Sequence, residues 1–193
     1  MRIIGAIAGL ALTIATTTTA NAVNMPVGGR TSQPLGHWQL CRTLPEECRT
    51  RSRATTPVRL TGDVLRLLRE VNDRFNTEVT PITDWDHHGV EERWSYPTTL
   101  GDCEDYVLAK RRELMRRGFR PSDLLITVVL QPNGEGHAVL SVRTSQGEFI
   151  LDNIDPKVRH WTRTNYDYVK RQSVRHTGTW VSIRDNRARL AMR

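Results

Sequence analysis

Long apolar runs are missing from this chain of 193 residues, because the longest, Ile3 to Ala15, is shorter than the roughly 20 residues that span a membrane. No block of lysine and arginine is interleaved with aromatic residues, which argues against nucleic-acid binding although the formal net charge is +7. The sequence also lacks an internal repeat and any sign of a second domain. Its 38% apolar content is enough to build one core without relying on its three cysteines.

The N-terminus has the pattern of an export signal. A positive Met1-Arg2 pair precedes the apolar run, and Ala20-Asn21-Ala22 matches a cleavage site of small residues. We therefore predict a signal peptide over residues 1–22 and a single mature domain over residues 23–193. The mature chain is expected outside the cytoplasm and without a transmembrane segment.

Export changes how the cysteines are interpreted. Cys41 and Cys48 lie close together in the sequence, and in an oxidising compartment we expect them to pair. Cys103 is then an unpaired thiol in an exported protein, which indicates either a reactive group or an inert buried one. Its acidic neighbours favour the reactive interpretation: Asp102, Glu104 and Asp105.

Two helices are predicted from the spacing of apolar residues. The first covers residues 62–75 with Thr61 as N-cap, and the second covers residues 103–117 and ends at Gly118. On the second helix a solvated basic face is expected, formed by Lys110, Arg111, Arg112, Arg116 and Arg117.

Strands are predicted after the second helix. Apolar and alternating segments indicate four of them, over residues 124–130, 137–144, 148–151 and 179–183. Other segments are rich in turn formers or polar residues and are expected to be irregular: residues 23–36, 49–56 and the loop that contains Asp84, His87 and His88.

Three residues form a pattern typical of nucleophilic catalysis. Cys103 opens a predicted helix, whose N-terminal N–H groups favour a thiolate. His137 begins one predicted strand and Asp152 ends its hairpin partner, so we expect the two to meet across the ladder. These residue types suit a nucleophile, a general base and a carboxylate that orients the base. The backbone N–H of Cys103 is the expected oxyanion donor.

The acidic residues beside Cys103 suggest a metal ion. Carboxylates next to a thiolate oppose its ionisation unless a cation compensates their charge. The oxygen ligands Asp102 and Glu104, with Asp84 from the preceding loop, suit calcium better than zinc. The alternative is that these acids only complement the positive end of the helix dipole. The adjacent His87 and His88 lack the spacing of a typical zinc pair.

Together these segments resemble the bacterial transglutaminase-like cysteine proteinases. The resemblance covers residues 37–183 and rests on three motifs: Gly101-Asp102-Cys103-Glu104-Asp105-Tyr106, Gly136-His137-Ala138-Val139-Leu140 and Leu151-Asp152-Asn153. Further matching positions are Val71, Asn72, Phe75, Asn76, Asp84, Gly89, Trp94, Ala109, Lys110, Trp161, Tyr166, Tyr168, Arg171, Gln172 and Ser173. The resemblance implies a papain-like, transglutaminase-type α+β fold, with the nucleophile at the N-terminus of a central helix packed on an antiparallel sheet.

The resemblance also implies a function. It implies a triad of Cys103, His137 and Asp152, and calcium (Ca2+) bound through Asp102, Glu104 and Asp84; His88 stands where the family has an aromatic residue. Family members cut large surface adhesins in the periplasm, release cells from biofilms and are held inactive by an inner-membrane receptor for cyclic di-GMP. We therefore predict a periplasmic, calcium-dependent cysteine endopeptidase, with an adhesin or another envelope protein as substrate and such a receptor as regulator.

Two alternatives remain open at the level of sequence. Acyl transfer to an amine, as in true transglutaminases, uses the same triad. A non-catalytic module that holds a peptide or a receptor would use the same groove. An amine-conjugation assay separates transfer from hydrolysis, and a binding module has no need of an activated thiol.

Overall fold

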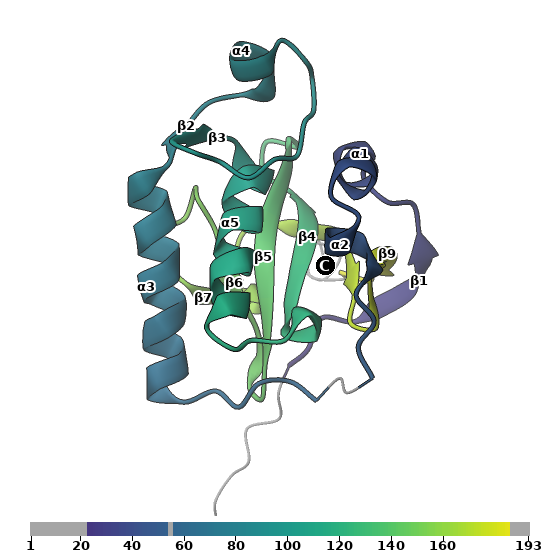
Figure 1. The fold of residues 1–193 in the computed structure, drawn as a ribbon. Coiled ribbons are helices and arrows are strands. Elements are labelled where there is room, and N and C mark those ends of the chain that lie inside the picture. The colour runs from purple at the N-terminus through teal and green to yellow at the C-terminus, as the bar shows by residue number, and fades with distance from the viewer. Residues whose placement is uncertain (1–22, 54–55, 186–193) are drawn as a thin grey trace, which may run out of the picture.

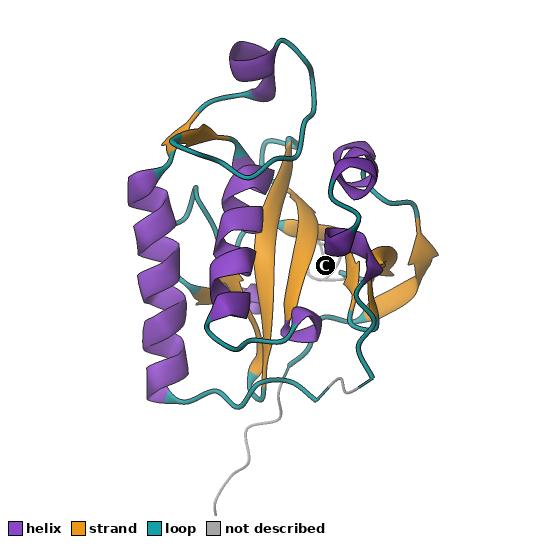
Figure 2. Cartoon of the chain, in the orientation of Figure 1, coloured by secondary structure: helices purple, strands orange, loops and turns teal. Residues whose placement is uncertain are grey.

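The centre of the fold is a seven-stranded antiparallel sheet (Figures 1 and 2). The computed structural model describes residues 23–53 and 56–185. The predicted signal peptide, residues 1–22, lies outside the described residues. The strand order is β1-β9-β8-β4-β5-β6-β7. The strands are β1 (Val27–Thr31), β4 (Leu124–Leu130), β5 (Gly136–Thr144), β6 (Gly147–Leu151), β7 (Arg159–His160), β8 (Asp167–Ser173) and β9 (His176–Ile183). A separate parallel pair joins β2 (Thr80–Pro81) to β3 (Leu100–Gly101).

Two long helices cover the centre of the sheet. α5 (Cys103–Arg116) lies against β5, and α3 (Gly62–Glu78) lies beside α5 (Figure 1). α1 (Leu35–Thr43) and α2 (Glu46–Arg49) lie nearer the other end of the sheet, where α2 contacts β9. α4 (Asp84–His88) projects from the chain between β2 and β3. None of the helices in the described residues combines the length and apolar character needed to cross a membrane.

Side chains of β5 alternate between two apolar clusters, as the period of two in a strand requires. Ala138, Leu140 and Val142 belong to the cluster shared with α3 and α5. Val139 belongs to a second cluster, formed by Met25, Val129, Val139, Ile150, Trp161, Tyr166, Tyr168 and Ile183. The strand that carries His137 is therefore packed on both faces, which makes it a rigid support.

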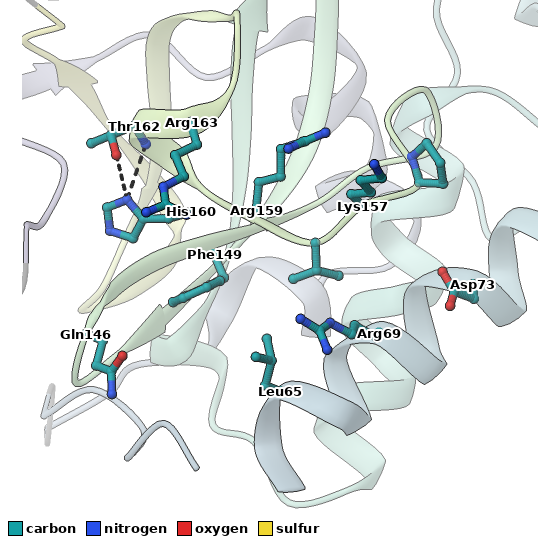
Figure 3. A pocket seen from close by; sticks show the side chains of 12 residues that line it. Leu65, Arg69, Asp73, Gln146, Phe149, Lys157, Arg159, His160, Thr162 and Arg163 are labelled. Carbon is teal, nitrogen blue, oxygen red and sulfur yellow. Dashed lines mark hydrogen bonds between the residues drawn. The ribbon is translucent and has the colours of Figure 1, made fainter. Parts of the chain in front are cut away.

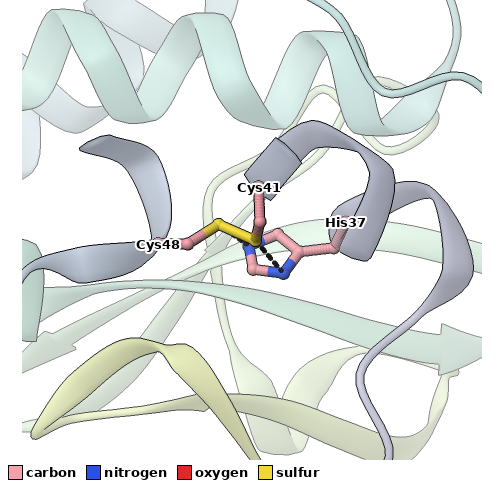
Figure 4. Close-up of side chains that lie close together, drawn as sticks. All are labelled: His37, Cys41 and Cys48. Carbon is pink, nitrogen blue, oxygen red and sulfur yellow. Dashed lines mark hydrogen bonds between the residues drawn. A yellow bond between two sulfur atoms is a disulfide. The ribbon is translucent and has the colours of Figure 1, made fainter. Parts of the chain in front are cut away.

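A disulfide ties α1 to α2 beside a buried histidine (Figure 4). Cys41 and Cys48 are bonded, with their Cα atoms 5.5 Å apart, which confirms the predicted pairing. His37 is fully buried, and its Nδ1 accepts a hydrogen bond from the indole N–H of Trp180 at 3.2 Å. Burial, helped by the charge of Arg111, lowers the pKa of His37 to about 3. This histidine is therefore neutral and serves the packing of α1 on the sheet.

The predicted helices and strands are all present, with small shifts of their ends. The first helix runs on to Glu78, and the hydroxyl of Thr61 accepts a hydrogen bond from the N–H of Val64 at 3.2 Å, which confirms the N-cap. The strand expected over residues 179–183 already begins at His176. Gly118 follows the second helix with φ +93°, a left-handed conformation that favours glycine.

Some segments predicted to be irregular are regular. Residues 23–36 contain β1 and the start of α1, and α4 covers His87 and His88. β8 was not predicted at all, because Lys170, Arg171 and Gln172 interrupt its apolar pattern. Two of these polar residues are buried with partners from other elements; Arg171, for example, pairs with Glu148 at 2.9 Å. Partners that are distant in sequence leave no local signal.

The prediction that Lys110 and Arg111 face solvent is wrong. Their exposed fractions are 1% and 2%. Arg111 pairs with Glu47 of α2 at 2.9 Å, and the Lys110 ammonium donates hydrogen bonds to side chains of α3. A buried cation is tolerated only with such partners. The other three basic residues of α5 and its C-terminal end, Arg112, Arg116 and Arg117, are exposed as predicted.

Candidate active site

Cys103 is the first residue of α5 and a half-buried free thiol. The thiol donates a hydrogen bond to Oε2 of Glu104 at 2.9 Å. Burial, the negative charge of Glu104 and this hydrogen bond raise the pKa of the thiol well above its ordinary value, and the backbone N–H of Ala138 opposes the shift. In this arrangement burial and Glu104 both favour the protonated thiol.

His137 and Asp152 form a buried pair, as the hairpin argument predicted. Nε2 of His137 and Oδ1 of Asp152 are 2.8 Å apart. The hydroxyl of Tyr166 and the backbone N–H of Ile154 also donate to the carboxylate. Burial opposes ionisation of Asp152, but the hydrogen bond and charge of His137 and the bond from Tyr166 outweigh it, so the pKa of Asp152 lies below its ordinary value. The carboxylate therefore stays ionised and orients the ring.

Cys103 and His137 line the same cleft, which has a volume of about 400 Å³. No hydrogen bond joins the two side chains within the part of the chain that the structure describes; the thiol is bonded to Glu104 instead. Because Nε2 of His137 is engaged by Asp152, Nδ1 is the ring nitrogen that remains for the thiol proton. The cleft is strongly acidic, with lining residues Glu91, Glu92, Asp102 and Glu104 and the cation Lys170.

Three carboxylates meet beside the thiol. Oxygens of Asp84, Asp102 and Glu104 all lie within 4.8 Å of one another. α4 supplies Asp84, and the first turn of α5 and its N-cap supply the other two. Burial and the charge of Asp84 raise the pKa of Asp102 to about 7, while burial and the charge of Asp102 raise the pKa of Glu104 to about 8. The cluster therefore lacks compensating positive charge.

An unsatisfied atom shows that the cluster fits a cation. Oδ1 of Asp102 is buried without a hydrogen-bond partner in the described structure. Buried polar atoms are almost always satisfied, and grouped carboxylate oxygens are the ligands that suit a calcium ion. Asp105, the third acid of the motif, lies outside this cluster and accepts a hydrogen bond from the N–H of Ser95 at 2.7 Å. The residues predicted as ligands are thus the ones that converge.

The comparison with known families identifies the family of the chain. Residues 27–188 match the family described as bacterial transglutaminase-like cysteine proteinase BTLCP. The chain belongs to the bacterial transglutaminase-like cysteine proteinases. No curated protein matches the sequence.

Solved structures of one such proteinase resemble this one. LapG of Legionella pneumophila in its calcium-bound form shares 26% sequence identity, with a TM-score of 0.50 over 56% of this chain and 64% of that chain. The EGTA-treated form of the same protein gives 27% identity and a TM-score of 0.49 over 56% and 62% of the two chains. The matched region therefore spans less than two thirds of the LapG chain.

This transglutaminase-like proteinase has the papain-like α+β fold that was predicted. α5 begins at Cys103 and packs on an antiparallel sheet whose strand β5 begins next to His137. The family is one of cysteine proteinases, which supports the predicted enzyme class.

The proteinase also holds Asp152 through residues to which no role was assigned from the sequence. The Lys110 ammonium donates to Oδ1 of Asn72 at 2.9 Å and to Oδ1 of Asn76 at 2.7 Å. Oδ1 of Asn72 also accepts from the backbone N–H of Asp152 at 3.0 Å, and the amide of Asn76 donates to the Asp152 carbonyl at 2.8 Å. One buried cation thus sets the orientation of two amides, which together clamp the backbone of the catalytic candidate.

A sequence signal for this clamp exists in the periodicity of α5. Lys110 lies three residues after Val107 and four before Leu114, which places it on the apolar face. A lysine on a buried face implies acceptors from another element. Asn72 and Asn76 are four residues apart on one face of α3, so they are a matching pair of acceptors.

Proposed function

We propose that this protein is a calcium-dependent cysteine endopeptidase with Cys103, His137 and Asp152 as its triad. The observation that carries the proposal is the hydrogen bond between Nε2 of His137 and Oδ1 of Asp152. It leaves Nδ1 to act as base in the cleft that contains the thiol at the N-terminus of α5.

The proposed reaction uses one ring for all of its proton transfers. Nδ1 of His137 takes the thiol proton, and the sulfur attacks the carbonyl carbon of the substrate peptide to form a C–S bond. The backbone N–H of Cys103 stabilises the oxyanion. His137 then gives the proton to the leaving amine as the C–N bond breaks. Water, deprotonated by the same ring, hydrolyses the thioester and restores the thiol.

Asp84, Asp102 and Glu104 are the proposed calcium ligands. A calcium ion bound there supplies the positive charge that these carboxylates lack. The raised pKa values of Asp102 and Glu104, the unsatisfied Oδ1 of Asp102 and the likeness to a calcium-bound LapG support this assignment. Glu104 also accepts the hydrogen bond of the Cys103 thiol, so the state of this carboxylate affects the nucleophile directly.

The catalytic proposal is tested with the variant Cys103→Ala. The variant should fold like the parent protein and cut no protein substrate; proteolysis retained in it would rule out the assigned nucleophile. Incubation of the parent protein with an amine donor and a glutamine peptide tests the acyl-transfer alternative, because only a transferase forms the conjugate.

We further propose that the protein acts in the periplasm on a surface adhesin or another envelope protein, under control of an inner-membrane cyclic di-GMP receptor. The export pattern of residues 1–22 and the family membership support this setting. Proteomics of shed surface proteins from cells with the parent enzyme or the Cys103→Ala variant provides the test. Shed proteins that do not differ between the two strains would contradict the proposed substrate class.

A further inference from the structure

A second cavity lies between α3 and the edge strand β7, and it shares no lining residue with the catalytic cleft (Figure 3). Its volume is about 810 Å³, roughly twice that of the cleft. Its walls come from α3, from β6 and from the segment that runs from Pro156 to Arg163. The proposed catalytic chemistry uses none of these residues.

The rim of this cavity is strongly basic, in contrast to the acidic cleft. Figure 3 shows Arg69 on α3 across the cavity from Lys157, Arg159 and Arg163. Arg159 is paired with Asp155 at 2.5 Å. The side chains of Arg69, Lys157 and Arg163 are exposed, and no ion pair engages them within the described residues. Asp73 also lines the cavity, but the cations outnumber it, and the excess of positive charge favours an anionic ligand.

Apolar side chains lie between these cations. Leu65, Phe149 and Val158 are half-buried in the lining of the cavity. A ligand that fits the site therefore carries both negative charge and apolar groups. Inorganic phosphate would leave the apolar surface uncovered.

The neighbouring sheet edge favours an extended chain as ligand. β7 is the last strand of the sheet order, so no strand of the described structure covers its outer side. Free strand edges bind extended peptides through main-chain hydrogen bonds, while pockets take alternate side chains. The cavity is also open to solvent rather than enclosed, which suits a chain that enters and leaves.

A short segment links this cavity to the triad. The segment begins at Asp152 and ends at Pro156, which lines the cavity. The side chain of Asn72 fixes both of its ends. Oδ1 of Asn72 accepts from the N–H of Asp152 at 3.0 Å, and its amide donates to the carbonyl of Pro156 at 2.9 Å. The cavity therefore has a fixed position relative to the catalytic cleft.

We propose that this cavity is an exosite that binds an acidic segment of the protein substrate, with apolar side chains between its carboxylates. The proposal rests on the proposed protease function in one respect: that function is why the bound segment is expected to belong to a protein substrate. Binding itself does not depend on catalysis, so it is measured separately.

The test uses the Cys103→Ala protein, which leaves a peptide uncut, and fluorescence anisotropy of a labelled peptide of alternating glutamate and valine. This peptide should bind, and binding should weaken as salt is added. A triple variant that reverses three charges of the cavity should weaken binding by about tenfold or more. Its substitutions are Arg69→Glu, Lys157→Glu and Arg163→Glu. A peptide of alternating lysine and valine should not bind.

A matched triple variant controls for net charge. This control changes the total charge by the same amount at exposed positions outside the cavity, through Arg30→Glu, Arg53→Glu and Arg175→Glu. It should bind the peptide as the Cys103→Ala protein does. Equal weakening in both triple variants, or no binding by the parent protein, would overturn the exosite. Loss in the cavity variant alone supports it, even if the parent enzyme cuts no peptide. Circular dichroism confirms that each variant is folded.

Discussion

At the scale of single residues, Asp152 is held from two directions. His137 and Tyr166 engage its carboxylate, and the amides of Asn72 and Asn76 engage its backbone. Lys110 has no direct bond to Asp152 but fixes both amides. Burial lowers the pKa of Lys110 to about 7, against the attraction of Asp152 and Asp73. The orientation of Asp152 therefore depends on a buried lysine that does not line the catalytic cleft.

Replacing Lys110 by methionine tests this positioning role. The variant Lys110→Met keeps much of the side-chain volume but removes the ammonium that donates to Oδ1 of Asn72 and of Asn76. We expect a stability loss of about 1–3 kcal/mol and a decrease in kcat of about tenfold or more, with KM little changed. Thermal unfolding measures the loss of stability, and steady-state kinetics well below the melting temperature measure kcat and KM.

Arg116, an exposed cation on the same helix, provides the control. Arg116→Met removes a charge whose side chain is 77% exposed and should leave kcat and stability nearly unchanged. A Lys110→Met enzyme with the kcat of the parent would show that the clamp is dispensable. A merely structural role for Lys110 would lower stability without changing kcat of the folded enzyme.

At the scale of elements, the start of α5 joins the proposed nucleophile, Cys103, to the acidic cluster. α4 completes the cluster with Asp84, although this short helix projects away from the sheet. Helix N-termini favour negative charge, but here the number of buried carboxylates exceeds what the dipole compensates, as the pKa values of Asp102 and Glu104 show. The folding of this end of α5 should therefore depend on both pH and calcium.

The pH dependence has a definite sign. Without a cation, the pKa values of Asp102 and Glu104 rise on folding to about 7 and about 8, from ordinary values near 3.8 and 4.5. The folded protein then binds more protons than the unfolded chain, so its stability falls as pH rises from about 5 to about 8. Calcium should remove this decrease, because it favours the ionised carboxylates.

Melting temperatures across this pH range, in EGTA and in calcium chloride, measure the effect. The variant Asp102→Asn with Glu104→Gln should lose the stabilisation by calcium and show a weaker pH dependence, of which a part remains because burial also raises the pKa of Asp105 to about 7. Identical melting curves with and without calcium at pH 8 would be evidence against the metal site.

At the scale of the whole molecule, local patterns predicted the central architecture. The spacing of apolar residues placed α3, α5 and the hairpin of β5 and β6, and with them all three triad candidates. The same patterns did not predict β1, which is mostly exposed and contains glycine, or β8, which carries buried polar residues. The periodicity of α5 places Lys110 on a buried face, but which acceptors it reaches depends on how α3 packs beside α5, and the bond from the Cys103 thiol to Glu104 depends on side-chain geometry.

Export of the molecule is a prediction from residues 1–22 alone. Residues 1–30 fused to alkaline phosphatase should yield active enzyme outside the cytoplasm, because the phosphatase needs disulfides that form there. A fusion with Arg2→Glu, which removes the positive charge of the n-region, should be exported less efficiently. A parent fusion that stays in the cytoplasm would contradict the predicted signal peptide.

The alkylation rate of Cys103 as a function of pH is the most direct measurement of whether His137 activates this thiol. The other two cysteines are disulfide-bonded, so iodoacetamide reports on one site. With calcium bound, the parent protein should show a thiol pKa below the free value of about 8.5, and His137→Ala should remove that shift. A thiol that titrates above the free value in saturating calcium, or that ionises equally in both proteins, would contradict the proposed nucleophile and base.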